Sequence, residues 1–246
     1  MKKKSFKIIT CILAIILIII LSFIGVFLFT SYAPTKDALN YLEDTSTVNI
    51  EVDDLLTFTP KNGQSSTGLI IYPGAKVQAE SYAPLAHKIA EAGYTVVITP
   101  MPLNFAILNS NAADKAIEAF PNIENWAIAG HSLGGVMATK YANEYEIIDG
   151  VILYASYPQG DELKNSSIKV TSIYASLDGV ADNDKVVSSK ELLPKDTKFI
   201  KIEGGNHAQF GNYGEQSGDN KATISVDEQI NQSVQASIEL LNSISN

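Results

Sequence analysis

Short apolar runs alternate with helical segments along most of this chain, and this alternation constrains the fold more than any other feature. Strands are expected at TGLIIY, YTVVITP, WAIAG, GVILYAS, VTSIYAS and TKFIKI, with amphipathic helical segments between most of them and at the C-terminus. The alternation predicts an α/β domain over residues 47–246, with a mainly parallel sheet covered by helices on both faces. VNIEV and LLTFTP, before the first of these runs, predict two short antiparallel strands.

A serine between glycines directly follows one predicted strand. In WAIAGHSLGG, residues 126–135, Ser132 has Gly130 and Gly134 on either side, and a predicted helix follows. So tight a strand-to-helix turn needs small flanking residues and holds the serine at the carboxyl edge of the sheet. We predict that Ser132 is a nucleophile and that the backbone N–H of Leu133 stabilises an oxyanion beside the helix N-terminus. The alternative is a serine that only caps the helix.

A serine nucleophile needs a base, which is usually histidine. The chain has three histidines. His87 lies inside a predicted helix, and His131 adjoins the serine on a turn where consecutive side chains point apart. His207 follows the last predicted strand, in the Gly- and Asn-rich segment 204–225, and so lies at the same edge as the serine. Loops of this length are usually functional or disordered. We therefore predict that His207 is the base.

The acid that orients the histidine should follow a strand between the serine and the histidine. Asp178 does so in VTSIYASLDGVAD. Asp182 and Asp184 are rivals, but they fall where the next helix begins and are typical of N-cap and first-turn acids. Asp161 and Glu162, in the connection after GVILYAS, are further alternatives. We predict Asp178.

A second oxyanion donor is expected from the loop YPGAKVQAESY, which precedes the first long helix. Gly74 lets the backbone of this loop approach a substrate. By position the donor is the N–H of Ala75, with that of Lys76 as the second choice. The alternative is a plain Pro-Gly turn.

Together, IAGHSLGG, SLDGVAD, GGNHAQFG and YPGAK resemble the α/β-hydrolase superfamily, in the order Ser, Asp, His. More closely, the chain resembles a small, lidless, membrane-tethered bacterial branch related to dienelactone hydrolases and carboxylesterases. The resemblance implies an eight-stranded sheet, acyl-enzyme chemistry and no cofactor. One departure is that PGA replaces the His-Gly motif common before the oxyanion turn. Only about a dozen residues separate GVILYAS from VTSIYAS, so the usual lid is missing and we expect short or medium acyl substrates.

The N-terminal region, residues 1–30, predicts a membrane anchor. Residues 8–29 form an uncharged run of 22 residues, and about 20 apolar residues span a bilayer core. The run is longer than the usual ~7–15-residue core of a cleaved signal peptide, which is the rival interpretation. Four lysines precede it, so the N-terminus is expected in the cytoplasm and the catalytic domain outside. Residues 31–46 are expected to form a stalk.

Charge and cysteine content exclude several classes of function. Beyond the anchor, 14 basic residues face 27 acidic ones, a net charge of −13. A charge of this sign opposes binding to nucleic acid phosphates and to anionic lipid. Cys11 is the only cysteine and lies in the predicted anchor, so the domain has no disulfide or thiol chemistry. No metal-binding or nucleotide-binding motif is present.

The sequence therefore predicts a membrane-anchored serine hydrolase that acts on small-molecule carboxylic esters outside the cell. Ser132 is the predicted nucleophile, His207 the base and Asp178 the orienting acid. An acyltransferase or thioesterase with the same triad is the first alternative. A non-catalytic binding module on the same fold is the second, because fold alone does not establish activity.

Overall fold

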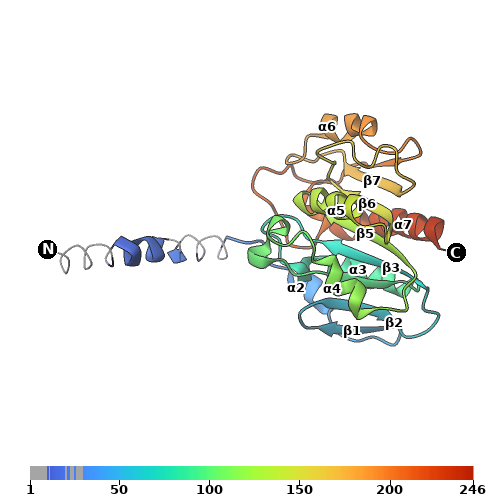
Figure 1. The fold of residues 1–246 in the computed structure, drawn as a ribbon, viewed down its shortest axis with the longest axis horizontal. Coiled ribbons are helices and arrows are strands. Elements are labelled where there is room, and N and C mark those ends of the chain that lie inside the picture. Colours follow the sequence, from blue (N-terminus) through green and yellow to red (C-terminus); the bar gives the residue numbers. More distant parts are fainter. Residues whose placement is uncertain (1–9, 11, 20, 23–24, 26–29, 246) are drawn as a thin grey trace.

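An eight-stranded sheet in the order β1-β2-β4-β3-β5-β6-β7-β8 forms the centre of the molecule (Figure 1). The computed structural model describes residues 10, 12–19, 21–22, 25 and 30–245. β2 pairs antiparallel with β1 and β4, and every other pairing is parallel. Both the mainly parallel sheet and the antiparallel pair are thus confirmed. The strands are β1 (Val48–Val52), β2 (Leu56–Pro60), β3 (Thr67–Tyr72), β4 (Thr95–Ile98), β5 (Asn125–His131), β6 (Ile148–Tyr154), β7 (Lys169–Ala175) and β8 (Lys198–Ile202).

Helices cover both faces of this sheet because successive side chains of its buried strands point to opposite sides. In β3, Leu69 and Ile71 join the core under α3 and α7, whereas Ile70 and Tyr72 join the core under α4 and α5. The α-helices are α2 (Lys36–Asn40), α3 (Ala83–Glu91), α4 (Ala113–Ala119), α5 (Leu133–Glu144), α6 (Asn183–Ser188) and α7 (Val226–Ile244). Short 3₁₀ turns are η1 (Ala79–Tyr82), η2 (Pro102–Asn104), η3 (Ala106–Leu108), η4 (Ser189–Glu191) and η5 (Ala208–Phe210).

The connections that follow the parallel strands gather at one edge of the sheet, where the strands end. The serine turn follows β5, the Ala75 loop follows β3, and the Asp178 and His207 loops follow β7 and β8. The connection from β6 to β7, residues 155–168, contains no helix. The expected absence of a helical lid at that position agrees with the structure.

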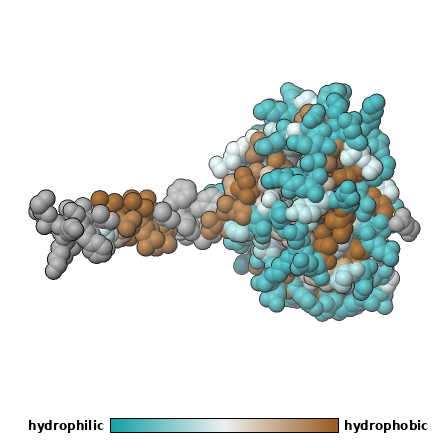
Figure 2. Space-filling view, viewed as in Figure 1, coloured by the Kyte–Doolittle hydropathy of each residue, from teal (hydrophilic) through white to brown (hydrophobic). Residues whose placement is uncertain are grey.

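The predicted anchor lies partly outside the described residues. Within the part of the chain that the structure does describe, no helix is both long enough and apolar enough to cross a membrane. Residues 12–19 are helical, and the large apolar side chains between Ile12 and Leu21 that are described are all exposed. In Figure 2 the described residues of this segment are coloured as apolar, whereas the visible face of the domain is largely polar.

Candidate active site

Ser132 is the single residue between β5 and α5, and its backbone is strained. Its φ of 51° and ψ of −122° lie in a region that non-glycine residues rarely adopt. A Cβ on Gly130 would overlap the backbone of Gly134, and a Cβ on Gly134 would overlap the carbonyl oxygen of Tyr72. Both glycines are therefore required by close backbone contact, as the sequence pattern indicated. The turn leaves the Ser132 side chain half-buried at the carboxyl edge.

His207 and Asp178 are in direct contact. His207 Nδ1 lies 2.9 Å from Asp178 Oδ2, and the two side chains are 1% and 0% exposed. The other carboxylate oxygen of Asp178 accepts hydrogen bonds from the backbone N–H groups of Val180 (2.8 Å) and Ala181 (2.7 Å). The carboxylate is therefore fixed by its own loop and can hold the imidazole in one tautomer and orientation. Nδ1 is occupied by this contact, which leaves Nε2 for proton transfer.

The rival acids lie elsewhere. Asp182 is the N-cap of α6, where its Oδ1 accepts the N–H groups of Asp184 (3.0 Å) and Lys185 (3.4 Å). Asp184 lies in the first turn of that helix and is exposed, as are Asp161 and Glu162. The helix-capping interpretation of Asp182 is thus confirmed, and none of these acids contacts a histidine among the described residues.

His87, on α3, is a buried residue with a structural role. Its side chain is buried, its ring makes an edge contact with Tyr41, and its Nδ1 lies 3.9 Å from Glu91. Burial lowers the pKa of His87, and the Glu91 carboxylate opposes that shift. The residue packs under the stalk and has no contact with the serine turn.

Backbone hydrogen bonds distinguish the two donors that the sequence offers in the loop after β3. Among the described residues, the N–H groups of Ala75 and Leu133 have no hydrogen-bond partner. The N–H of Lys76 donates to the carbonyl of Asn104 at 2.7 Å. Lys76 is therefore already engaged as a donor, which favours Ala75 as the second oxyanion group.

A buried chain of hydrogen bonds links the oxyanion loop to the residue before the serine. The N–H of Gly74 donates to Tyr82 Oη at 2.9 Å, and Tyr82 Oη lies 2.8 Å from His131 Nδ1. The tyrosine oxygen accepts from Gly74 N–H and makes its second hydrogen bond with Nδ1, in which the donor is set by the tautomer of His131. A Cβ on Gly74 would lie 2.8 Å from His131 Nδ1, so the loop can approach this ring only as glycine.

His131 also lies against the candidate base. The ring centroids of His131 and His207 are 4.5 Å apart. Burial, followed by the repulsion from His207, holds the pKa of His131 well below its usual value. A neutral His131 avoids two adjacent imidazolium rings when His207 takes up a proton. Sequence reasoning eliminated His131 as the base but missed its contacts with Tyr82 and His207.

Asp219 joins the two loops that carry the acid and the base. Its Oδ1 accepts the N–H of Gly179, and its Oδ2 accepts the N–H of Ala208, both at 2.9 Å. Gly179 directly follows Asp178 and Ala208 directly follows His207. One carboxylate therefore fixes the backbone next to both residues. No local sequence signal distinguishes Asp219 from other loop acids.

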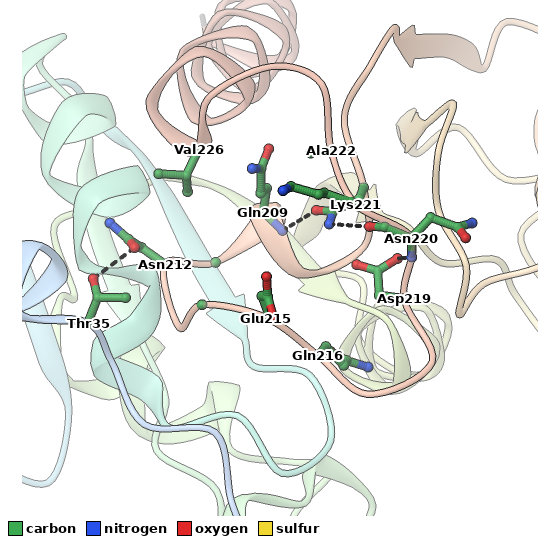
Figure 3. A pocket seen from close by; sticks show the side chains of 13 residues that line it. Thr35, Gln209, Asn212, Glu215, Gln216, Asp219, Asn220, Lys221, Ala222 and Val226 are labelled. Atoms are coloured by element: carbon green, nitrogen blue, oxygen red, sulfur yellow. Dashed lines mark hydrogen bonds between the residues drawn. The ribbon is translucent and has the colours of Figure 1, made fainter.

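Figure 3 shows a cavity of about 510 Å³ beside the loop that carries His207. Asn206 and Gln209, which flank His207, line this cavity, whereas His207 and Ser132 do not. Its walls are polar side chains that mostly bond within the loop; for example, Asn206 Nδ2 donates to the carbonyl of Asn220 at 2.7 Å. The cavity therefore lies beside the candidate base and is not lined by the candidate catalytic side chains. In the described part of the chain, no cluster of three or more His, Cys, Asp or Glu residues is placed to hold a metal ion.

Comparison with known proteins gives one family match. A family model described as "Alpha/beta hydrolase family" matches residues 68–231, which is two thirds of the chain. No curated protein sequence matches the chain.

Solved structures of several hydrolases have the same fold. Est1E from Butyrivibrio proteoclasticus is 16% identical with a TM-score of 0.56, over 80% of this chain and 100% of that chain. A thermostable esterase from Pseudomonas putida ECU1011 is 14% identical with a TM-score of 0.58, over 85% and 88%. A predicted CIB-like hydrolase from Thermoplasma acidophilum is 16% identical with a TM-score of 0.56, over 79% and 98%. At these identities the similarity concerns the fold alone.

Proposed function

Because the chain belongs to the alpha/beta hydrolase family, we propose that it is a membrane-anchored serine hydrolase that cleaves carboxylic esters through an acyl-enzyme. The observation that carries this proposal is the buried contact of His207 with Asp178, at the sheet edge where the strained Ser132 turn lies. A buried imidazole held by a carboxylate has the environment of a general base. The esterases among the structural neighbours add support at the level of the reaction class.

In the proposed mechanism, Ser132 Oγ attacks the acyl carbon while His207 Nε2 takes up its proton. The N–H groups of Leu133 and Ala75 hold the negative charge that develops on the carbonyl oxygen. The tetrahedral intermediate collapses, and the departing alkoxide takes the proton from His207 and leaves as the alcohol. Water then attacks the acyl-enzyme with His207 again as the base, and the acid is released.

The N-terminal run and the charge pattern support the proposed location. Residues 8–29 carry no charge, and four lysines precede them, which favours a cytoplasmic N-terminus and an outward catalytic domain. An exposed apolar surface such as that of residues 12–19 is typical of contact with lipid or a partner. Protease added to intact cells is expected to remove the catalytic domain, and protection of the domain until lysis would contradict this location.

Labelling with a fluorophosphonate tests the nucleophile. We expect Ser132→Ala to lose all labelling and to retain at most the ~10³–10⁴-fold catalysis that binding and oxyanion groups supply without a nucleophile. Ser110→Ala is the matched control, because Ser110 lies after β4 at the same edge and its hydroxyl bonds only the Asn111 side chain. Hydrolysis is separated from acyl transfer by analysing products with an added alcohol. Equal labelling of both variants would contradict the assignment of Ser132.

A further inference from the structure

The N-terminal segment joins the domain directly at the candidate active site. The N–H of Tyr32 donates to the carbonyl of Lys76 at 2.7 Å, and the N–H of Gln78 donates to the carbonyl of Tyr32 at 3.0 Å. Tyr32 is thus bonded to the loop that carries Ala75. The apolar run of the predicted anchor ends only three residues earlier, at Phe29. Three residues span at most about 11 Å, so the oxyanion loop lies close to the end of the anchor.

A second attachment fixes the stalk to the loop of the candidate base. The N–H of Thr35 donates to the carbonyl of Asn212 at 2.9 Å, and Thr35 Oγ1 donates to the Asn212 side chain at 2.8 Å. Asn212 belongs to the same loop as His207. With both loops bonded to the stalk, the stalk joins the domain at the carboxyl edge of the sheet.

Exposed apolar side chains lie at this same edge. Ile107 and Leu108 are 54% and 55% exposed and are the most exposed large apolar residues in the described range 30–245. They belong to η3, in the connection after β4. That connection is bonded to the oxyanion loop through Lys76 N–H and the carbonyl of Asn104. In Figure 1 the N-terminal segment leaves the domain beside this green connection, and Figure 2 shows apolar surface on that side.

The occupant that fits this surface is the lipid bilayer itself. The anchor ends within about 11 Å of the loop to which the exposed residues are bonded, so the bilayer surface is the nearest apolar phase. The outer part of the chain has a net charge of −13, which disfavours attraction to anionic headgroups and leaves apolar insertion as the contact.

We infer that Ile107 and Leu108 insert into the outer surface of the bilayer and turn the Ser132 edge toward it. This inference rests on the proposed function for its substrate, which is a short- or medium-chain ester of an alcohol anchored in the membrane. The reacting carbonyl of such an ester lies at headgroup depth, so a lidless site can reach it without extracting a lipid. Leu103 and Asn104, which precede the two apolar residues in this connection, adopt left-handed φ values of 53° and 56°, and such values persist only where the surrounding structure enforces them.

The first test places an environment-sensitive fluorophore on the loop. The full chain carries Cys11→Ser and Leu108→Cys, is labelled with NBD, and is reconstituted in phosphatidylcholine vesicles that contain a lipid-attached quencher. Ile147→Cys is the matched control, because Ile147 is 44% exposed and precedes β6 at the opposite edge of the sheet. We expect quenching and a blue shift at position 108 and neither at position 147. Equal solvent exposure of the two probes would overturn the inference.

The second test separates docking from catalysis. In the vesicle-bound full chain, Ile107→Ser combined with Leu108→Ser is expected to lower turnover of a bilayer-anchored butyrate ester about tenfold. Turnover of soluble p-nitrophenyl butyrate is expected to stay unchanged, as is turnover of both esters by Ile147→Ser. Loss on both esters, or on neither, would overturn the inference. A wild-type chain inactive on both esters would contradict the proposed function, and the fluorescence result would still decide the docking.

Discussion

Backbone strain is concentrated at the edge of the sheet that holds the candidate site. Among the described residues, the non-glycine positions with positive φ are Lys76, Leu103, Asn104, Ser132 and Ala155. Each lies in a connection that follows β3, β4, β5 or β6. Such conformations cost about 1–3 kcal/mol each and persist only where the surroundings enforce them. The strained residues therefore lie around the candidate site, where the surrounding structure fixes the positions of the backbone N–H donors before a substrate binds.

Asp178 should contribute to the rate through the tautomer of His207. In Asp178→Asn an amide replaces the carboxylate oxygen that faces Nδ1, and the imidazole loses its working orientation. We expect kcat to fall by about 10⁴, which is the loss that the same Asp-to-Asn change causes in a serine protease. Asp184→Asn is the control and should stay within about twofold, because Asp184 is exposed in the first turn of α6. Near-normal turnover by Asp178→Asn would show that the contact of this carboxylate with His207 is not needed for catalysis.

Tyr82 should act on the rate by holding the oxyanion loop. Tyr82→Phe removes the hydroxyl between Gly74 N–H and His131, and an unpaired buried group costs about 1–3 kcal/mol. If the loop relaxes, kcat falls about tenfold or more while KM changes little. Tyr154→Phe is the matched control, because it removes another buried hydroxyl, bonded to Ser237, with no contact to the oxyanion loop. Equal loss of stability without a selective loss of kcat would make Tyr82 structural only.

The sequence predicts part of this residue network and not the rest, for a physical reason. Ser132, His207 and Asp178 follow predicted strands, and parallel strands bring their carboxyl ends to one edge of the sheet, so the position of all three at that edge follows from order along the chain. The contact of Tyr82 with His131 joins residues 49 positions apart. It depends on how the side chains pack at the edge of the sheet, which no local pattern encodes.

At the scale of elements, long-range bonds turn a Gly- and Asn-rich segment into an ordered loop. Side chains bond the backbone of this segment in place of a strand ladder. The N–H of Asn206 donates to the Gln229 side chain of α7, and the Asp219 carboxylate accepts from the N–H groups of Gly179, Ala208 and Asn220. Asn and Asp side chains commonly satisfy backbone groups in this way. The Gly- and Asn-rich composition of the segment fits either a functional loop or a disordered one. The structure shows an ordered loop, and its order depends on contacts with residues far away in the sequence.

Asp219→Asn tests whether this order is needed for catalysis. The amide can accept at only one of its two ends, so one of the links to Gly179 and Ala208 is lost. If the link contributes about 1–2 kcal/mol to positioning, kcat falls about five- to thirtyfold. The matched control is Asp182→Asn, which also loses backbone acceptors but only at the N-terminus of α6. Comparable kcat values for the two variants would show that the link does not position the acid and base.

Element boundaries follow the sequence where one pattern dominates and deviate where local bonds compete. The apolar spacing of the last segment predicts a helix over 226–244, and α7 has those bounds. The expected helix DNDKVVSSKELL is shorter, because α6 ends at Ser188 and continues as a 3₁₀ turn. The hydroxyls of Ser188 and Ser189 donate to carbonyls three residues back, which competes with the helical ladder.

At the scale of the whole molecule, the short connection between β6 and β7 limits the size of the acyl site. Lidded lipases cover a long acyl groove with an insertion at this position, and residues 155–168 contain no helix that could do so. Phe210 and Tyr213, in the His207 loop, are themselves buried and add little accessible wall. A shallow site of this kind can bury only the first carbons of a long chain.

Acyl selectivity should therefore rise over a few carbons and then stop. A fully buried methylene contributes about 0.8 kcal/mol, or roughly fourfold in kcat/KM, whereas a carbon that stays in water contributes nothing. We expect kcat/KM for p-nitrophenyl esters, measured below their micelle concentrations, to increase from acetate, reach a maximum at short or medium chains, and not increase further. The assay uses the full chain in vesicles of ether-linked lipids, which contain no ester that could compete with the substrate. The Ser132→Ala variant gives the background rate. A continued increase per carbon up to the longest soluble ester would require a deep acyl groove, which the short β6–β7 connection does not provide.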